Sequence, residues 1–185
     1  LRLTMRHQYR ALAQILGNLG ADLSNPVNSL FQTLGRQAKK IPVADEGVFK
    51  IREAGDTADT AWTRPGYNDA QWAIFDPTSK RTPYGKALVR ASFKMPPDLV
   101  DSGLAVDLGT VDDYDEVWLN GVKIGETSDK NTSPDQAYSV HRVYPIPGGL
   151  LAAGENVLAI RAWNRNADSK DWKTWLRGPI VIRPL

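Results

Sequence analysis

The stretch LAVDLGTVDDYDEVWLNGVKIG, at residues 104–125, decides the fold of this chain. Apolar residues alternate with small or polar residues on both sides of its acidic centre. Alternation with a period of two predicts half-buried β-strands. Asn120 and Gly121 predict a type I′ turn, because both residues tolerate the positive φ that this turn requires. We therefore expect a hairpin unit here: a strand, an acidic turn, a second strand, the Asn-Gly turn and a third strand.

Other short segments of β-strand character precede and follow this stretch. Turn formers separate them, and they lie at residues 48–51, 86–95, 138–146, 157–163 and 179–183. Short strands at regular spacing, without a helical period, indicate an antiparallel β-sandwich. We assign this domain to residues 41–185.

Residues 1–40 have a helical pattern instead. An apolar stripe recurs every three or four residues, at Met5, Tyr9, Leu12, Leu16, Leu19 and Leu23. Asn25 and Pro26 interrupt the stripe as an N-cap and a first-turn proline would, which predicts helices over roughly 4–22 and 26–38. The stripe packs either on the β domain or a preceding domain, or it forms a stalk. A stalk would make a homodimer, bind a partner protein or lead from a membrane anchor.

The composition is that of a soluble globular protein. Of the 185 residues, 42% are hydrophobic and 24% are charged, and the net charge of +2 argues against a nucleic-acid partner. Residues 1–40 carry six basic residues against one acid, and residues 41–185 carry seventeen against twenty, which suggests two units. The chain lacks the run of about 18 apolar residues that spans a membrane. It also lacks cysteine, which fits an extracytoplasmic, periplasmic or secreted protein.

Five motifs in the predicted β domain follow one another in an order that resembles a known module. Residues 68–72 resemble its D-x-x-W segment, residues 88–96 its W-x-R-x-x-F-x-x-P strand with leucine in the first position, and residues 111–121 its D-x-x-x-V-x-x-N-G hairpin. Residues 142–156 resemble its R-x-Y-x-I-P-x-x-L-L-x-x-G-x-N segment, and residues 178–179 fit its closing strand. The module is the galactose-binding-like, sugar-binding jelly roll at the N-terminus of family 2 glycoside hydrolases. Similar modules occur in sialate O-acetylesterase-type proteins and in extracytoplasmic sensor regions of bacterial signalling proteins.

The resemblance covers about residues 48–185 and carries expectations about fold and residue roles. It implies a mainly β, antiparallel jelly-roll sandwich, which the α-helical arm at residues 1–40 precedes. It implies that aspartate and asparagine side chains fix turns, that tryptophans fill the core and that Arg90 pairs within the domain. It also implies that catalysis resides in another domain.

The residues themselves contain no recognisable catalytic constellation. His7 and His141 stand on different predicted units, no serine lies in a Gly-x-Ser-x-Gly elbow, and no histidine has zinc-ligand spacing. A glycosidase needs two carboxylates separated across a sugar, whereas the acids of residues 112–116 crowd on one turn. We therefore expect no catalytic residue and no enzymatic activity in this chain.

The acidic cluster of Asp112, Asp113, Asp115 and Glu116 has two interpretations. The first is a solvated turn whose aspartates bond nearby backbone amides. The second is a structural calcium ion, since hard cations prefer clustered oxygen ligands. We favour the first and expect no metal site and no cofactor.

The candidate ligand site is the polar loop at residues 164–177, which is long for a hairpin connection. Aromatic rings stack on the apolar face of a sugar, and polar side chains pair with the hydroxyls that leave water. We expect a second aromatic-rich connection, at residues 62–72, to border the same end of the sandwich. The candidate ligand-binding residues are Trp172, Asn164, Arg165, Asn166, Asp171, Trp62 and Tyr67, whereas core or strand packing is expected of Trp72, Trp118 and Trp163.

These observations favour a non-catalytic ligand-recognition or sensory module of a larger extracytoplasmic protein. Carbohydrate is the ligand class that the resemblance implies. One alternative is an accessory domain of a glycoside hydrolase or esterase that binds no sugar itself. The other is a protein–protein interaction module that uses the helical arm.

Overall fold

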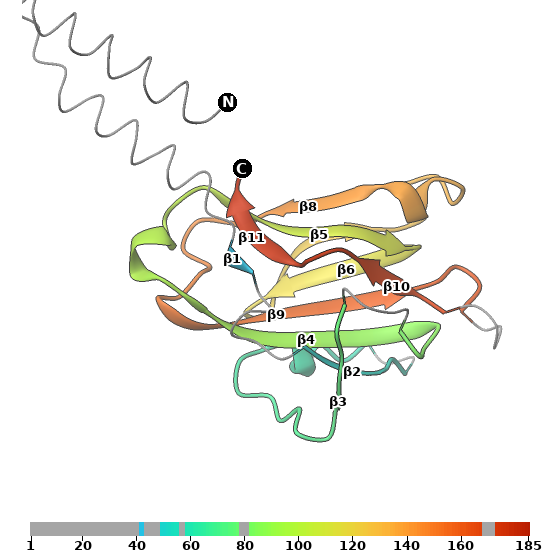
Figure 1. Ribbon diagram of the computed structural model, residues 1–185, viewed down its shortest axis with the longest axis horizontal. Coiled ribbons are helices and arrows are strands. Elements are labelled where there is room, and N and C mark those ends of the chain that lie inside the picture. The colour runs from blue at the N-terminus through green and yellow to red at the C-terminus, as the bar shows by residue number, and fades with distance from the viewer. Residues whose placement is uncertain (1–40, 43–48, 56–57, 78–81, 168–172) are drawn as a thin grey trace, which may run out of the picture. The chain divides into compact units, whose positions relative to one another are not determined.

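The described part of the chain is a sandwich of two antiparallel β-sheets. The computed structural model describes residues 41–42, 49–55, 58–77, 82–167 and 173–185. The two sheets enclose one hydrophobic core, to which Val89 and Ile160 contribute from one sheet and Val106 and Ile182 from the other (Figure 1). This arrangement confirms the predicted antiparallel β-sandwich.

One sheet has six strands. They are β2 (Lys50–Glu53), β3 (Ala73–Ile74), β4 (Lys86–Met95), β6 (Tyr114–Leu119), β7 (Val122–Thr127) and β9 (Gly154–Trp163). Their order across the sheet is β3-β2-β4-β9-β6-β7. The two central strands, β4 and β9, pair along their whole length, from Lys86 opposite Trp163 to Met95 opposite Gly154.

The other sheet has five strands around β5. They are β1 (Ile41–Pro42), β5 (Leu104–Asp112), β8 (His141–Pro145), β10 (Trp175–Arg177) and β11 (Val181–Pro184). β8 pairs with one edge of β5, while β11 and β10 pair with successive parts of its other edge. β1 pairs with β11. Three short 3-10 turns connect strands: η1 (Ala61–Thr63), η2 (Pro97–Leu99) and η3 (Ala137–Ser139).

The stretch at residues 104–125 forms the three expected strands but not the expected arrangement. Asn120 and Gly121 have φ values of 50° and 85°, which confirms the positive φ values predicted for their turn. β5 and β6 belong to different sheets, however, with Asp113 alone between them. The acidic segment therefore carries the chain from one sheet to the other, and the prediction of a hairpin turn there is wrong.

The roles that the resemblance implied for polar residues are confirmed. Arg90 is 3% exposed, donates to the carbonyl of Trp62 at 3.0 Å and forms an ion pair with Asp69 at 3.2 Å. Asn120 donates to the side chain of Asn156 at 2.8 Å and accepts from the amide of Val157 at 2.8 Å. These contacts fix the loop at Asp69 and the Asn-Gly turn against the six-stranded sheet.

A second apolar cluster covers part of the outer face of the six-stranded sheet. It contains Trp62, Trp72, Leu88, Trp118 and Ala159. The rings of Trp62 and Trp118 pack edge to face, with centroids 5.5 Å apart. The expectation that Trp72 and Trp118 are packed inside the domain is confirmed, because they are 8% and 5% exposed.

Other boundaries differ from those expected. The polar loop predicted at residues 164–177 contains the short strand β10. Pairing with β5 stabilises this strand, because the residue pattern of β10 alone does not predict one. The segment at residues 138–146 begins with the end of η3 before it continues as β8. The predicted helical arm, with helices at 4–22 and 26–38, lies outside the described residues and stays a prediction. Among the described residues, no helix has the length and apolarity needed to cross a membrane.

Candidate functional site

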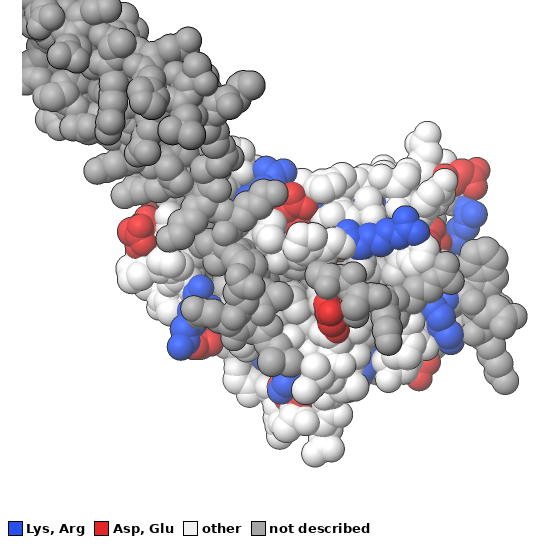
Figure 2. Space-filling model, viewed as in Figure 1, with Lys and Arg blue, Asp and Glu red and all other residues white. Residues whose placement is uncertain are grey.

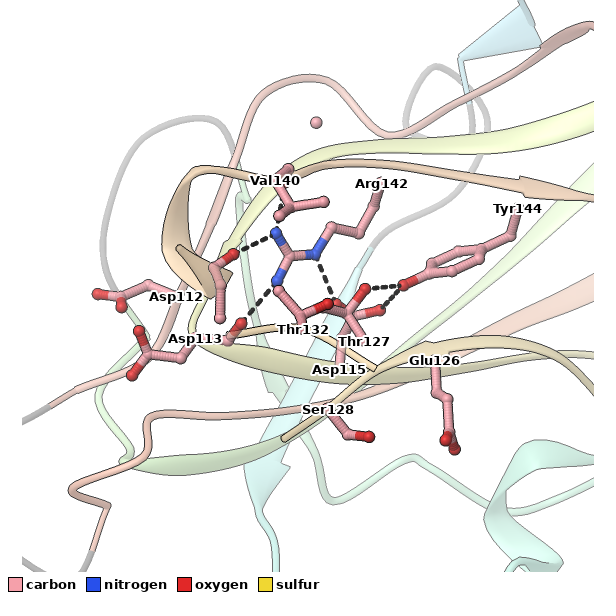
Figure 3. Close-up of polar contacts among 12 residues, drawn as sticks. Asp112, Asp113, Asp115, Glu126, Thr127, Ser128, Thr132, Val140, Arg142 and Tyr144 are labelled. Atoms are coloured by element: carbon pink, nitrogen blue, oxygen red, sulfur yellow. Dashed lines mark hydrogen bonds and ion pairs between the residues drawn. The ribbon is translucent and has the colours of Figure 1, made fainter. Parts of the chain in front are cut away.

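The acid-rich segment places one carboxylate, that of Asp115, in the interior. Asp115 and Arg142 form an ion pair in which both side chains are fully buried, and Nε of Arg142 lies 2.8 Å from Oδ1 of Asp115. Figure 3 shows the Arg142 guanidinium and the Tyr144 ring reaching toward this carboxylate. Removing two charges from water is costly, and close pairing is what offsets that cost.

Arg142 uses its remaining N–H groups on backbone carbonyls. It donates to Ala137 at 2.6 Å, to Asp113 at 2.6 Å and also to Val140. One guanidinium thereby joins the residue between β5 and β6, the turn η3 and its own strand β8. The Asp115–Arg142 ion pair is placed to stabilise the fold rather than to meet a ligand, because both charges are enclosed by protein groups and shielded from solvent.

Tyr144 completes this buried polar network. Its hydroxyl donates to Oδ2 of Asp115 at 2.5 Å and lies 2.8 Å from Oγ1 of Thr127. Burial, reinforced by the neighbouring Asp115, raises the pKa of Tyr144 far above that of a free phenol, so the donor stays protonated. Burial also raises the pKa of the Asp115 carboxyl, and the hydrogen bonds from Tyr144 and Arg142 act in the opposite direction.

We expect Tyr144→Phe to lower the free energy of unfolding by about 1–3 kcal/mol, because Asp115 would lose a buried donor. Urea unfolding followed by tryptophan fluorescence measures the change. Tyr138→Phe is the matched control, since that side chain is 51% exposed. Equal stability of Tyr144→Phe and the unchanged chain would show that the hydroxyl contributes nothing.

The other acids of the segment also have partners within the protein. Oδ2 of Asp113 accepts from the amide of Arg165 at 3.0 Å. Glu116 forms ion pairs with Lys123 at 2.7 Å and with Arg161 at 3.0 Å. In the part of the chain that the structure describes, no three His, Cys, Asp or Glu side chains are grouped to hold a metal ion. The first interpretation, a solvated turn, does not describe the cluster, because Asp113 and Asp115 are only 4% and 0% exposed. Asp113 does accept from a backbone amide, but that amide belongs to Arg165, 52 residues along the chain.

A pocket of about 430 Å³ opens on the outer face of the six-stranded sheet. It is lined by Ala54, Gly55, Ala58, Lys86, Glu116, Glu126, Ser128, Asp129, Lys130, Arg161 and Trp163. Arg161 and Trp163 alternate along β9 with the core residues Ile160 and Ala162, so both project from the opposite face. Figure 3 shows the same alternation at the end of β7 and in the residue after it: Thr127 points toward Asp115, and Glu126 and Ser128 point away from it.

Ion pairs hold three of the charged lining residues in place: Glu116, Glu126 and Arg161. Lys123 bridges Glu116, at 2.7 Å, and Glu126. Partial burial acts against the charged ammonium, but the hydrogen bonds to both glutamates prevail and raise the pKa of Lys123. The bond from Lys123 lowers the pKa of Glu126. On the face of the molecule that Figure 2 draws, basic and acidic side chains are likewise interspersed.

The sequence-predicted ligand residues of the loop after β9 fall into two groups. Trp172 and Asp171 lie outside the described residues. Asn164 is only 2% exposed, and its side-chain oxygen accepts from the amide of Asn166 at 2.8 Å, which fixes the start of the loop. Arg165 and Asn166 are exposed, and the guanidinium of Arg165 lies 3.0 Å from Asp135.

Trp62 and Tyr67 lie at a different place from this loop. Trp62 is 1% exposed in the second apolar cluster, so its ring has no free face on which a sugar could stack. Tyr67 is half-buried against the same cluster. The cluster packs over Ala159, and Asn164 follows five residues later, a distance of about 16 Å along a strand. The structure therefore does not bring Trp62 to the loop as expected.

The sequence interpretation missed the pocket. Trp163 was expected in strand packing, and its ring does contact Tyr114, with centroids 5.7 Å apart. Trp163 is nevertheless only half-buried and lines the pocket. The period-two pattern of residues 157–163 contained a signal, because it puts Arg161 and Trp163 on one face. The contributions of β4, β6 and β7 depend on strand order, which the sequence does not display.

Comparison with known proteins relates the chain to glycoside hydrolases. A family model described as the second all-beta domain of beta-galactosidase matches residues 57–168. A search of curated proteins found no match.

Several solved structures share the fold. A beta-glycosidase from Bacteroides vulgatus aligns with a TM-score of 0.57 at 21% identity, over 78% of this chain and 20% of that one. A Bacteroides uniformis beta-glucuronidase aligns with a TM-score of 0.59 at 14% identity, over 78% of this chain and 17% of that one. An exo-chitosanase from Amycolatopsis orientalis aligns with a TM-score of 0.55 at 14% identity, over 78% of this chain and 20% of that one. At such identities the likeness shows the fold alone, and the chain spans at most about a fifth of these proteins.

Proposed function

The chain belongs to the family of beta-galactosidase second all-beta domains, and from this membership we propose that it is a non-catalytic accessory domain of a larger family 2 glycoside hydrolase. The observation that carries the proposal is the extent of the match. The region that aligns is 78% of this chain but only 20% of the Bacteroides vulgatus beta-glycosidase. A unit that accounts for so small a share of an enzyme is expected to support its catalytic part.

The polar geometry supports a structural role for the acid-rich segment. A glycosidase needs one carboxyl group that donates a proton and a second that acts as nucleophile or base, both free to face the sugar. Asp115 is enclosed with Arg142, and Glu116 is held by Lys123 and Arg161. These carboxylates stabilise the sandwich and its outer face rather than attack a substrate.

The finer parts of the proposal are a jelly-roll sandwich of the galactose-binding-like kind and recognition of carbohydrate. The pocket beside Trp163 is the observation that favours carbohydrate recognition as a second function. The comparisons favour an accessory role over a sensory one. An extracytoplasmic location, and association of a second copy or a partner through residues 4–38, are further proposals that follow from the sequence alone.

An assay for hydrolysis tests the non-catalytic role. We expect the full chain to release no nitrophenol from aryl β-galactoside, β-glucuronide or β-glucosaminide above the rate in buffer. A catalytic glycosidase provides the positive control for each substrate. Turnover by the chain that disappears in the variant Glu116→Gln would overturn the proposal.

A further inference from the structure

The turn between β6 and β7 contains Asn120-Gly121, the one asparagine–glycine sequence in the chain. In such a pair the main-chain nitrogen of the glycine can attack the side-chain carbonyl of the asparagine, since glycine has no side chain to hinder it. A bond forms between N of Gly121 and Cγ of Asn120, the Cγ–Nδ2 bond breaks, and ammonia leaves with the proton of the glycine amide. Water then opens the cyclic imide at either carbonyl and leaves aspartate or isoaspartate at residue 120.

The main chain of Asn120 has a conformation that prevents this attack. Its φ is 50°. For a residue other than glycine such a φ belongs to the left-handed α region, where ψ is roughly +30 to +60°. With ψ in that range, N of Gly121 lies nearly opposite Cβ of Asn120 across the Cα–C bond, whereas the five-membered imide needs both atoms on the same side. The ring can therefore close only after the turn has opened.

The side chain of Asn120 is held as well. Nδ2 donates to the carbonyl of Leu150 at 2.9 Å and to Oδ1 of Asn156 at 2.8 Å, and Oδ1 accepts from the amide of Val157 at 2.8 Å. Asn156 is 1% exposed and is itself fixed by three hydrogen bonds to the main chain. The nitrogen that would leave Asn120 and the carbonyl that would be attacked are therefore both fixed in the folded domain.

We propose that Asn120 is a deamidation site that the folded domain protects and the unfolded chain exposes, so that prolonged unfolding becomes irreversible. Water is the only co-reactant, so the reaction needs neither an enzyme nor a cofactor. The inference concerns the chemical durability of the domain, and it stands whether or not the domain is an accessory part of a glycoside hydrolase.

Neither product fits the folded turn. An aspartate carboxylate has no hydrogen to donate, so it would face the carbonyl oxygen of Leu150 and Oδ1 of Asn156 as a third acceptor. Isoaspartate routes the main chain through the former side chain and adds a carbon atom to the connection between Leu119 and Val122, which pair with each other. Loop length fixes the register of a hairpin, so the longer connection disturbs the pairing of β6 with β7.

Peptide mapping of the full chain during incubation at mildly alkaline pH tests the protection. Trypsin releases Asn120 in a peptide that ends at Lys123, and chromatography separates its asparagine, aspartate and isoaspartate forms. We expect the folded chain to deamidate about tenfold or more slowly than the chain in guanidinium chloride, because only the open state reacts. A synthetic peptide of residues 113–126, incubated in both solutions, measures the effect of the denaturant on the chemistry itself. Equal rates in the folded and unfolded chain, after that correction, would overturn the proposal.

Asn120→Asp tests the fate of the product. We expect this variant to unfold at a lower urea concentration than the unchanged chain or to fail to fold, while Asn166→Asp, the same change at an exposed residue, leaves the urea midpoint unchanged. Chains kept in denaturant and then diluted should refold in a fraction that falls with time, with isoaspartate at residue 120 concentrated in the part that does not refold. An Asn120→Asp variant as stable as the unchanged chain would overturn the proposal. Equal isoaspartate content in the refolded and unrefolded parts would overturn it as well.

Discussion

Replacing Arg142 by methionine should lower the free energy of unfolding by about 3–5 kcal/mol, the usual cost of leaving one buried charge without its partner. Asp115 is fully buried opposite Arg142 at 2.8 Å, and methionine offers it no hydrogen-bond donor. The carbonyls of Ala137 and Asp113 would lose their donor as well. Urea unfolding monitored by tryptophan fluorescence measures the loss.

Arg165→Met provides the control for this change. Arg165 also pairs with an aspartate, Asp135 at 3.0 Å, but the two side chains are 40% and 88% exposed. Exposed pairs contribute little, so we expect unfolding at the same urea concentration as the unchanged chain. If the two variants unfolded alike, the buried network would not be what holds β6 to β8.

Gly109→Ala should be strongly destabilising, with a loss of roughly 2–5 kcal/mol from backbone strain and overpacking together. Gly109 has a φ of +71°, and a Cβ there would lie 2.2 Å from the carbonyl oxygen of Arg177. That contact is with backbone, which cannot rotate away. Gly109 stands where the register of β5 against β8 shifts and where β10 approaches.

Gly149→Ala separates the two costs. Gly149 has a φ of +75°, but a Cβ there would meet nothing within 4 Å. We expect this variant to lose only the strain of the positive φ, about 1–2 kcal/mol. Equal losses for Gly109→Ala and Gly149→Ala in thermal unfolding would contradict the close approach of β10 to β5.

Local patterns in the sequence predicted local structure well. The β-strand character of residues 86–95, which two prolines follow, predicted β4 with its observed bounds, and Asn120 with Gly121 predicted the turn between β6 and β7. Both signals depend on neighbouring residues alone. β10 escaped prediction because three residues are too few for a period-two signal, and pairing with β5 supplies what its own sequence lacks.

Contacts between residues far apart in the chain could not be predicted from the sequence. Arg142 is 27 residues from Asp115, and no spacing rule connects them. The single residue Asp113 between β5 and β6 looked like a turn, because a change of sheet and a hairpin turn use the same residue types. The pocket could not be predicted, because its lining comes from four strands whose order across the sheet the sequence does not show.

One proton NMR time course on the full chain with a neutral disaccharide such as cellobiose or lactose distinguishes a non-catalytic domain from a hydrolase. We expect saturation transfer from protein to sugar, which reports binding, together with anomeric signals of constant intensity throughout the incubation. Growth of monosaccharide anomeric signals would contradict it, because the domain would then be hydrolysing the sugar rather than holding it.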